Sequence, residues 1–182
     1  MTGALRFRAL QSDDLRLVHE WVQRPHVRRW WGDHGTYQEV VEHYLPSIEG
    51  EEPTDHYIVF LDEQPVGFIE TYLVSDHPDY AALVGVGEGV AGVDLFIGEV
   101  GLIGQGLGTE IIGRFVEEIV FAASATTGCI AGPDARNVAS IRAFENPFFF
   151  SSASSFLNSP FRPRTIGARI MTRSPSVSPS TF

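Results

Sequence analysis

The sequence predicts a single mixed α/β domain, and three observations lead to this fold class. Segments with the alternating pattern of strands are interspersed with segments of helical spacing, in the order β, α, α, β, β, β, α, β, α. Apolar residues make up 43% of the 182 residues, which is enough for one buried core. The sequence contains no internal repeat and no apolar run long enough to cross a bilayer.

The first third of the chain is predicted to contain one strand and two helices. Apolar and polar residues alternate in the strand, whereas Leu15, Val18 and Val22 recur at helical spacing after an aspartate-rich start. We expect Pro25 to end or delay the first helix and Pro46 to stop the second, because a proline nitrogen cannot donate a hydrogen bond. The expected elements are a strand at 5–10, a helix at 13–23, a loop or short turn at 27–35 and a helix at 36–48.

The middle of the chain is predicted to form a hairpin and a third strand. Two β-rich runs flank the turn residues 63–65, which indicates antiparallel partners. Polar residues, glycines and a proline then favour a loop at 75–89. The expected strands lie at 56–62, 66–74 and 90–99.

The stretch GLIGQGLG, 101–108, follows a strand and leads into a helix. Four glycines in eight residues cost conformational entropy, so we expect a need for bare backbone there. A glycine-rich turn between a strand and a helix is an arrangement in which free amides face an anion. The absence of lysine excludes a P-loop and the spacing excludes a Rossmann fingerprint, whereas a purely structural turn stays open. The remaining expected elements are a helix at 109–121, a strand at 127–133 and a helix at 137–145.

Charge is distributed unevenly along the chain. All 23 acidic residues lie in 1–145 together with nine arginines, a net charge of −14, whereas 146–182 has four arginines and no acid. Such acidity favours cationic partners and disfavours nucleic acid, although plain solubility is the alternative. We expect residues 1–145 to form the domain and 146–182 to be an atypical C-terminal segment rich in Ser, Pro and Arg, with disorder past about residue 172.

The cysteine and histidine content argues against an internal disulfide and against a metal site. Cys129 is the single cysteine, which excludes an internal disulfide, and a buried position is expected for it. The six histidines have no metal-ligand spacing, so no metal is expected. The N-terminus lacks the layout of a secretory signal, and we therefore expect a cytoplasmic protein.

Three blocks in the second half of the chain form a pattern: VDLFIGE, then IGQGLGT opening a helix, then P-x-x-x-N-x-x-S-I-R-x-F-E. Together they resemble the acetyl-CoA signature of the GNAT acetyltransferases. With WWGD, YLPSI and QPVGFIETY, the chain over about residues 5–145 more closely resembles the aminoglycoside 6′-N-acetyltransferases. The resemblance implies a GNAT-like mixed central sheet flanked by helices. It also implies acetyl transfer from acetyl-CoA to the 6′-amine of an aminoglycoside antibiotic, by direct attack on the thioester, in a monomer or homodimer.

The resemblance further implies how acetyl-CoA is held. Main-chain amides of the glycine-rich loop would hold its pyrophosphate, and the strand before the loop would splay from its neighbour to pair with the pantetheine arm. One N–H near Leu95 or Phe96 would face the thioester oxygen. The implied cofactor-binding residues are Leu95, Phe96, Ile97, Ile103, Gly104, Gln105, Gly106, Leu107, Gly108, Thr109 and Asn137.

Asp94 is the candidate catalytic base, because an acceptor amine must lose a proton and the matching Asp of the resembled family assists this step. An acid within an apolar strand is costly unless it is hydrogen-bonded or faces a wet cleft, and a role in anchoring the backbone is the alternative. Glu70 and Tyr72 share one strand face and would line an acidic cleft with Asp94. The tryptophans would stack on a sugar or cover a cation. The expected substrate-binding residues are Trp30, Trp31, Glu70, Tyr72, Asp94 and Asp134, with Asp33 and Asp55 as outer candidates.

Two departures from the resembled family keep alternatives open. Gly132 stands where an Asp is common before the proline, which leaves Asp134 as its substitute. Phe144 stands where a Tyr usually protonates the departing thiolate, and its loss is expected to slow the reaction about ten- to a hundredfold. The alternatives are an acetyltransferase of another amine, such as a siderophore precursor, and a catalytically weak protein that binds CoA or aminoglycoside.

Overall fold

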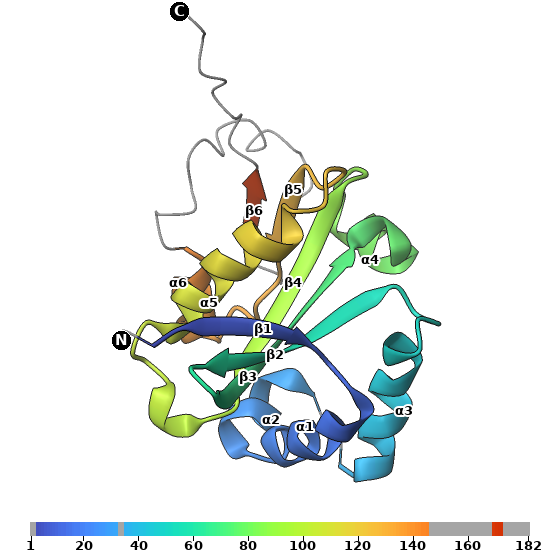
Figure 1. Cartoon of the computed structure of the whole chain (residues 1–182). Coiled ribbons are helices and arrows are strands. Elements are labelled where there is room, and N and C mark those ends of the chain that lie inside the picture. Colours follow the sequence, from blue (N-terminus) through green and yellow to red (C-terminus); the bar gives the residue numbers. More distant parts are fainter. Residues whose placement is uncertain (1–2, 33–34, 146–168, 173–182) are drawn as a thin grey trace, which may run out of the picture.

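The computed structural model of the chain describes residues 3–32, 35–145 and 169–172 (Figure 1). Within these residues one sheet has the strand order β1-β2-β3-β4-β5-β6. Neighbouring strands are antiparallel except for the parallel pair β4 and β5. The strands are β1 Leu5–Ala9, β2 Thr54–Leu61, β3 Gln64–Leu73, β4 Val90–Ile97, β5 Gly128–Ala131 and β6 Arg169–Thr172.

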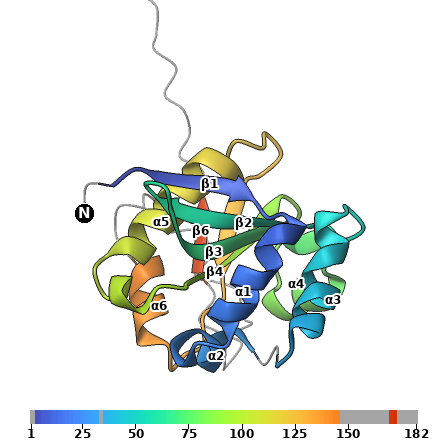
Figure 2. The same cartoon turned by 60° about the horizontal axis from the view of Figure 1, so that its bottom comes forward.

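Helices cover both faces of this sheet, as Figures 1 and 2 show. One face carries α1 Leu15–Val22, α2 Pro25–Trp31 and α3 Tyr37–Ile48, with α4 Pro78–Val84 beside them. The other face carries α6 Val138–Phe144 and α5 Leu107–Phe115, which continues into a π-helical turn, Val116–Val120. The predicted mixed sheet flanked by helices is confirmed.

Strand alternation explains why there are two apolar layers. Ile58, Phe68 and Phe96 point to one face and pack with side chains of α1 to α3. The alternate residues of the same strands, such as Ile69 on β3 and Val93 on β4, point to the other face and pack against α5. Burial of both faces ties each helix layer to the central strands.

The structure differs from the sequence-based prediction at three prolines. The predicted loop at 27–35 is wrong in its first part, because Pro25 begins α2 at a position where a helix needs no N–H donor. Pro46 lies inside α3 and does not stop it. The amide of Glu49 still donates to Leu45 O at 2.9 Å, so the helical hydrogen bonding continues past the proline. The predicted loop at 75–89 contains α4, which begins at Pro78 in the same manner.

Of the two C-terminal strands of the sheet, the sequence predicts one. The expected strand and helix are present as β5 and α6, and Cys129 is buried as expected, with burial raising the pKa of its thiol to about 12. Strand β6 was not predicted; it pairs with β5 from within the segment 146–182. The disorder predicted past residue 172 falls outside the described residues, and the boundary at 145 stays a prediction. In the described part of the chain, no helix is long and apolar enough to cross a membrane.

Candidate active site

Strand β4 has an open edge in its second half. It pairs with β5 only where Val90–Gly92 lie beside Gly128–Ile130, whereas its pairing with β3 continues to Ile97. Among the described residues, 93–97 therefore have a sheet partner on one side only, as the predicted splay of this strand requires. Their outward backbone groups are available to an extended ligand, except Ile97 O, which lies 3.1 Å from His26 Nε2.

The ladder between β3 and β4 determines which backbone groups face this edge. The amide of Gly98 donates to Val66 O at 2.9 Å, so Gly98 points toward β3. Successive residues of an antiparallel strand point their N–H groups to opposite sides, which turns Phe96 toward β3 and Leu95 toward the open edge. Of the two candidates for the amide that faces the thioester, the geometry favours Leu95, while the Phe96 side chain is 8% exposed and belongs to the core.

The glycine-rich loop presents a run of free amides. Gly104 and Gly106 adopt φ angles of +76° and +84°, which glycine tolerates best, and Gly106 is the N-cap of α5. Among the described residues, the amides of residues 104–109 have no hydrogen-bond acceptor. This run lies at a helix N-terminus, where the helix dipole favours an anion.

Other predicted cofactor residues have local structural roles. An added Cβ on Gly108 would contact Ala143 and Ile97 at 3.7 and 3.8 Å, so this glycine packs between α6 and β4. The Asn137 side chain caps α6 by accepting from the amide of Ser140 at 3.1 Å. Ile103 is 40% exposed in the loop.

A cluster that the sequence analysis missed fixes the start of the loop. Trp21 donates from Nε1 to Glu99 at 3.0 Å, and Arg24 pairs with the same carboxylate at 2.8 Å while donating to Gly98 O. These hydrogen bonds, first that from Arg24, lower the pKa of Glu99. A Cβ on Gly98 would lie 2.4 Å from the Trp21 ring, so only glycine fits beneath it. The loop therefore leaves β4 in a fixed direction.

A cavity of about 290 Å³ opens on the sheet face that carries α3 and α4. It collects acidic, histidine and tyrosine side chains from three strands and the neighbouring helices. Its lining comprises His43, Ser47, Glu52, Thr54, His56, Glu70, Tyr72, His77, Tyr80 and Asp94. The structure thus brings together three of the predicted site residues, Glu70, Tyr72 and Asp94.

Asp94 has the environment expected of a base. Burial, and then the nearby charge of Glu70, raise the pKa of the Asp94 carboxyl to about 6, against the effect of a hydrogen bond from Tyr72. That bond runs from the Tyr72 hydroxyl to Asp94 Oδ2 at 3.2 Å. A carboxyl with this pKa is ionised at neutral pH and is a better proton acceptor than an ordinary aspartate.

A transverse row of polar residues crosses the floor of the cavity. His56, Glu70 and Asp94 are successive register partners on β2, β3 and β4. His56 Nδ1 lies 3.1 Å from Glu70 Oε2, with side-chain exposures of 5% and 16%. Sequence analysis missed His56 because a lone histidine in an apolar strand belongs to no motif. The alternation of residues along 54–58, combined with the strand register, would have placed His56 on the cavity face.

The tryptophans do not take the predicted position in the cavity. Trp31 donates from Nε1 to the Tyr44 hydroxyl at 2.9 Å and packs edge-on against Phe68 and Phe96, so it supports the sheet. Trp30 lies under the Arg29 guanidinium, 4.7 Å from the ring centroid. Neither belongs to the described lining of the cavity.

Three predicted acids are also elsewhere. Asp134 is exposed and binds the Arg136 side chain and amide at 2.8 to 3.0 Å, which lowers the pKa of Asp134 to about 2. Asp55 is exposed on β2, one position from His56 and so on the opposite face. Asp33 lies outside the described residues.

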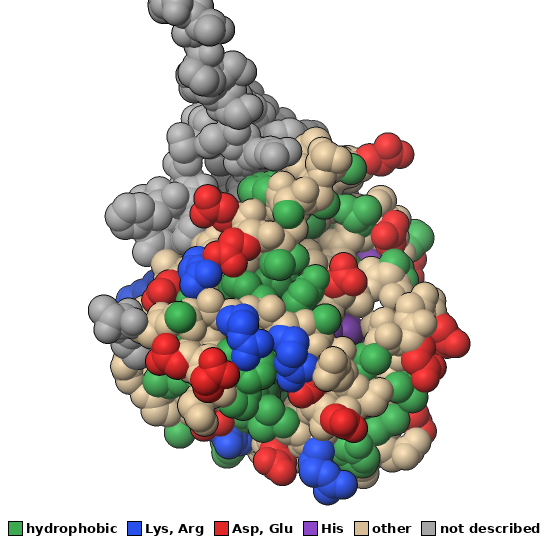
Figure 3. Space-filling view, in the orientation of Figure 1, with side chains coloured by type: hydrophobic (Ala, Val, Ile, Leu, Met, Phe, Trp, Pro, Cys, Tyr) green, Lys and Arg blue, Asp and Glu red, His purple; other side chains and the backbone are tan. Residues whose placement is uncertain are grey.

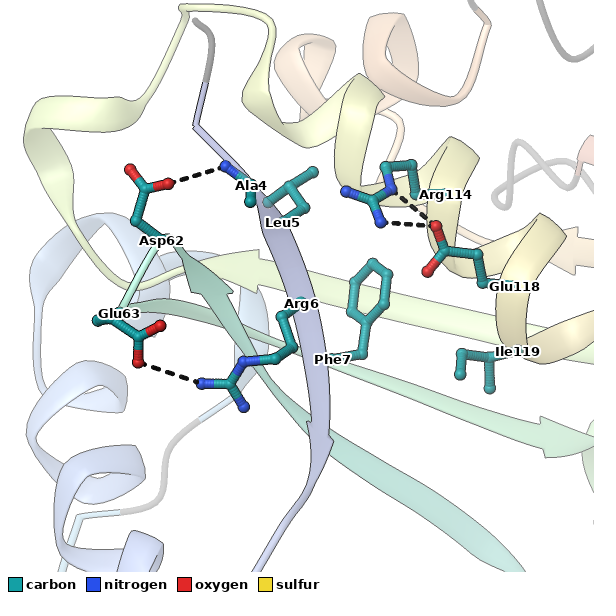
Figure 4. A pocket seen from close by; sticks show the side chains of 9 residues that line it. All are labelled: Ala4, Leu5, Arg6, Phe7, Asp62, Glu63, Arg114, Glu118 and Ile119. Atoms are coloured by element: carbon teal, nitrogen blue, oxygen red, sulfur yellow. Dashed lines mark hydrogen bonds and ion pairs between the residues drawn. The ribbon is translucent and has the colours of Figure 1, made fainter.

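A larger cavity of about 480 Å³ lies between β1 and α5 (Figure 4). Its charged side chains all have partners: Asp62 accepts from the backbone amide of Ala4, Arg6 pairs with Glu63, and Arg114 pairs with Glu118. It contains none of the predicted site residues, and we assign the chemistry to the smaller cavity.

Acidic side chains are spread over the face seen in Figure 3, with a group of arginines near its centre. The described residues contain no cluster of His, Cys, Asp or Glu placed to hold a metal ion.

A mixed sheet, a splayed strand and an amide-lined helix N-terminus together define an acetyltransferase of the GNAT class. The family described as acetyltransferase (GNAT) domain matches residues 11–153, and the chain belongs to this family. Aminoglycoside N(6′)-acetyltransferase type 1 of Klebsiella pneumoniae is 30% identical over 149 residues, covering 80% of this chain and 74% of that protein. The crystal structure of aminoglycoside acetyltransferase AAC(6′)-Ib with coenzyme A is similar, with a TM-score of 0.72 and 27% identity over 93% of this chain and 95% of that one. Its complex with coenzyme A and kanamycin has the same TM-score at 26% identity and the same coverage.

Proposed function

We propose that the protein transfers the acetyl group of acetyl-CoA to the 6′-amine of aminoglycoside antibiotics and thereby confers resistance. The observation that carries this proposal is the position of Asp94. It stands on β4, the strand with the open edge, and lines an acidic cavity on the face of α3 and α4. Relatives at 27 to 30% identity are aminoglycoside 6′-acetyltransferases by name.

The residues of the loop fit the diphosphate of acetyl-CoA. Residues 104–109 contribute bare amides at the N-terminus of α5, and the glycines keep side chains away from them. The open edge of β4 contributes the outward backbone groups of Leu95 and the outward amide of Ile97 for the amide-bearing pantetheine arm, whereas Ile97 O lies 3.1 Å from His26 Nε2. No metal is needed for either contact.

The cavity fits a polycationic acceptor. Glu52, Glu70 and Asp94 contribute carboxyl groups to a space that contains no lysine or arginine in its described lining. Several carboxylates in one partly enclosed site attract ammonium groups and concentrate a multiply charged ligand. The acidity of residues 1–145 reinforces this attraction over a longer range.

The transfer is a direct displacement. The acceptor ammonium group gives up one proton to the Asp94 carboxylate, and the electron pair freed on the nitrogen forms a C–N bond with the thioester carbon; the second N–H proton passes to solvent as the tetrahedral adduct collapses. The C–S bond breaks, and coenzyme A leaves as a thiolate. The outward amide of Leu95 is the donor that would stabilise negative charge on the carbonyl oxygen.

Phe144 supplies no proton to that thiolate. Its ring is 3% exposed and packs in the core beneath α5, so the thiolate would take its proton from solvent. A coenzyme A thiolate is stable enough to depart in this way. We therefore propose an active enzyme whose turnover lacks assistance by an acid at this position.

Thiol release from acetyl-CoA tests the function. Purified protein is incubated with acetyl-CoA and kanamycin or tobramycin, and the acetylated position is determined by mass spectrometry and NMR. Release with acetylation at the 6′-nitrogen supports the proposal. An aminoglycoside with a 6′-hydroxyl group is the matched control and should give no release. Release with other amines alone indicates the siderophore-type alternative, and tight binding without release indicates the weak binding protein.

We also propose a cytoplasmic location, since acetyl-CoA is present in that compartment.

A monomer and a homodimer are both compatible with a site built from one chain. Light scattering of the purified protein distinguishes the two. Equal turnover at dilutions below and above any dimer dissociation constant would support a site that is complete in the monomer.

A further inference from the structure

Tyr72 lies directly over the backbone of β4. It is the register partner of Gly92, and both residues point to the face of the cavity. A Cβ added to Gly92 would lie 2.3 Å from Tyr72 Cζ and 2.7 Å from its hydroxyl oxygen. Real carbon atoms do not approach so closely, so the phenol ring occupies the space that any side chain at position 92 would fill.

This position brings the Tyr72 hydroxyl to Asp94. Asp94 follows Gly92 by two residues on the same face, which makes it a diagonal cross-strand neighbour of Tyr72. The hydroxyl donates to Asp94 Oδ2 at 3.2 Å, and among the described residues Asp94 has no other hydrogen-bond donor. One carboxylate oxygen is thereby held, while the other is free for an acceptor ammonium group.

The ring is also supported from its outer side. His77 packs edge-on at 4.8 Å and Tyr80 at 6.2 Å between ring centroids, from the segment around α4. Burial, followed by the charge of Asp94, raises the pKa of the Tyr72 hydroxyl, so it stays protonated and remains a donor. A fixed, protonated phenol is suited to orienting a neighbouring carboxylate.

We infer that Tyr72 is a positioning residue for Asp94, and that Gly92 is required because only glycine leaves room for the ring. This inference rests on the proposed function and changes the predicted role of Tyr72, which sequence analysis treated as a substrate contact. Tyr72 acts on the reaction through Asp94, by fixing the direction of its carboxylate and favouring its ionised form.

The direction of the effect on acidity follows from the hydrogen bond. Donation to a carboxylate stabilises the charged form, and the bond from Tyr72 opposes the rise that burial and Glu70 cause in the pKa of Asp94. The charge of Asp94 also acts on Tyr80 from α4 and on Cys129 from β5, and the variant leaves both residues and Glu70 in place. Removal of the hydroxyl should therefore raise the pKa of Asp94 further. Asp94 then remains protonated, and unable to accept a proton, up to a higher pH.

The decisive variant is Tyr72→Phe, which keeps the ring and loses the hydroxyl. We expect the acidic limb of the profile of kcat/KM against pH to move to higher pH, with a loss of roughly three- to tenfold near pH 6.5. Activity should recover in part at alkaline pH, and the KM for acetyl-CoA should not change. Tyr57→Phe is the matched control, because Tyr57 packs against Phe115 on the other face of the sheet.

Gly92→Ala tests the same relationship without altering the tyrosine. The added methyl group should displace the ring and move the acidic limb in the same direction, and the double variant should show no larger movement than the larger single effect. Gly87→Ala is its control, since a Cβ there would meet nothing within 4 Å. If Gly92→Ala does not fold, Tyr72→Phe decides alone.

A readout without turnover separates this inference from the proposed function. The ¹³C resonance of the Asp94 carboxyl, assigned by its loss in Asp94→Asn, is titrated in the free protein. A higher titration midpoint in Tyr72→Phe supports the inference even if no aminoglycoside is acetylated. An unchanged midpoint, or a variant that changes only the KM for the acceptor, would overturn it.

Discussion

Glu70 lies directly opposite Asp94 across the antiparallel pair β3 and β4, so two carboxyl groups rise side by side from one face of the sheet. The charge of Glu70 is one of the causes that raise the pKa of Asp94 to about 6. One carboxylate therefore makes its neighbour a better base, and both present negative charge to an incoming ammonium group.

Glu70→Gln should separate these two effects. Loss of the neighbouring negative charge should lower the pKa of Asp94 and move the acidic limb of kcat/KM to lower pH, opposite to the effect of Tyr72→Phe. The KM for an aminoglycoside should rise roughly tenfold, as for loss of one partly buried ionic contact. Steady-state kinetics from pH 5 to 9 measures both. Glu117→Gln, at an exposed position outside the cavity, is the control, and an unmoved limb would contradict the assignment.

Asp94→Asn should abolish most turnover. The amide has nearly the shape of the carboxyl but cannot accept the proton, so kcat/KM should fall by about 10² to 10⁴. The acidic limb expected for the wild-type profile, from the raised pKa of Asp94 of about 6, should disappear with it. Coenzyme A binding, measured by calorimetry, should be unchanged. Full turnover in this variant would remove Asp94 from the mechanism.

The same substitution should stabilise the protein at neutral pH. Because the pKa of Asp94 is raised, the folded chain binds this proton more tightly than the unfolded chain, and the resulting stability is present at low pH and lost as pH rises through about 6. Asp94→Asn mimics the protonated form, so its gain in unfolding free energy should reach at most about 3 kcal/mol at pH 8 and nearly vanish at pH 4. Thermal unfolding of both proteins across this range measures it. A constant difference at every pH would contradict the prediction.

Gly106→Ala should weaken acetyl-CoA binding selectively. At a φ of +84° an alanine is strained by about 1 to 2 kcal/mol, and relief of that strain would turn the free amides of the loop away from the diphosphate. We expect a roughly tenfold higher KM for acetyl-CoA with little change in the KM for the aminoglycoside. Gly101→Ala in the same loop is the control, since its φ is not in the left-handed range and a Cβ there meets nothing within 4 Å. Equal effects at both positions would show that the loop is sensitive to any side chain.

Some residues of the site could be predicted from the sequence, and others could not. Asp94, Glu70 and Tyr72 were found because an acid in an apolar strand is unusual and because alternation places neighbours two positions apart on one face. The glycine-rich loop was found because glycine concentrates where bare backbone is needed. Trp31 was assigned to the substrate because the sequence cannot distinguish a tryptophan that covers a ligand from one that packs against Phe68.

The position of His56 opposite Glu70 depends on the register between β2 and β3. Counted outward from the hairpin turn, Leu61 pairs with Gln64 and Phe60 with Pro65, which would place Ile69 opposite His56. An irregularity between Val59 and Phe60 shifts the register by one residue, and Glu70 takes that place instead. A shift of one residue exchanges which face each partner presents, and no local pattern in the sequence announces it.

The class of fold, the family resemblance, the glycine-rich loop and an acid within an apolar strand can all be read from the order of the amino acids. The loop and the acid follow from residue type and spacing within one segment, whereas the fold class and the family resemblance follow from the order of several segments along the chain. The tertiary structure decided that Tyr72 rests on Gly92, that Leu95 faces the open edge, and that His56, Glu70 and Asp94 form one row. These relationships depend on pairings between residues that lie 14 to 32 positions apart in the chain, which packing of the whole sheet determines.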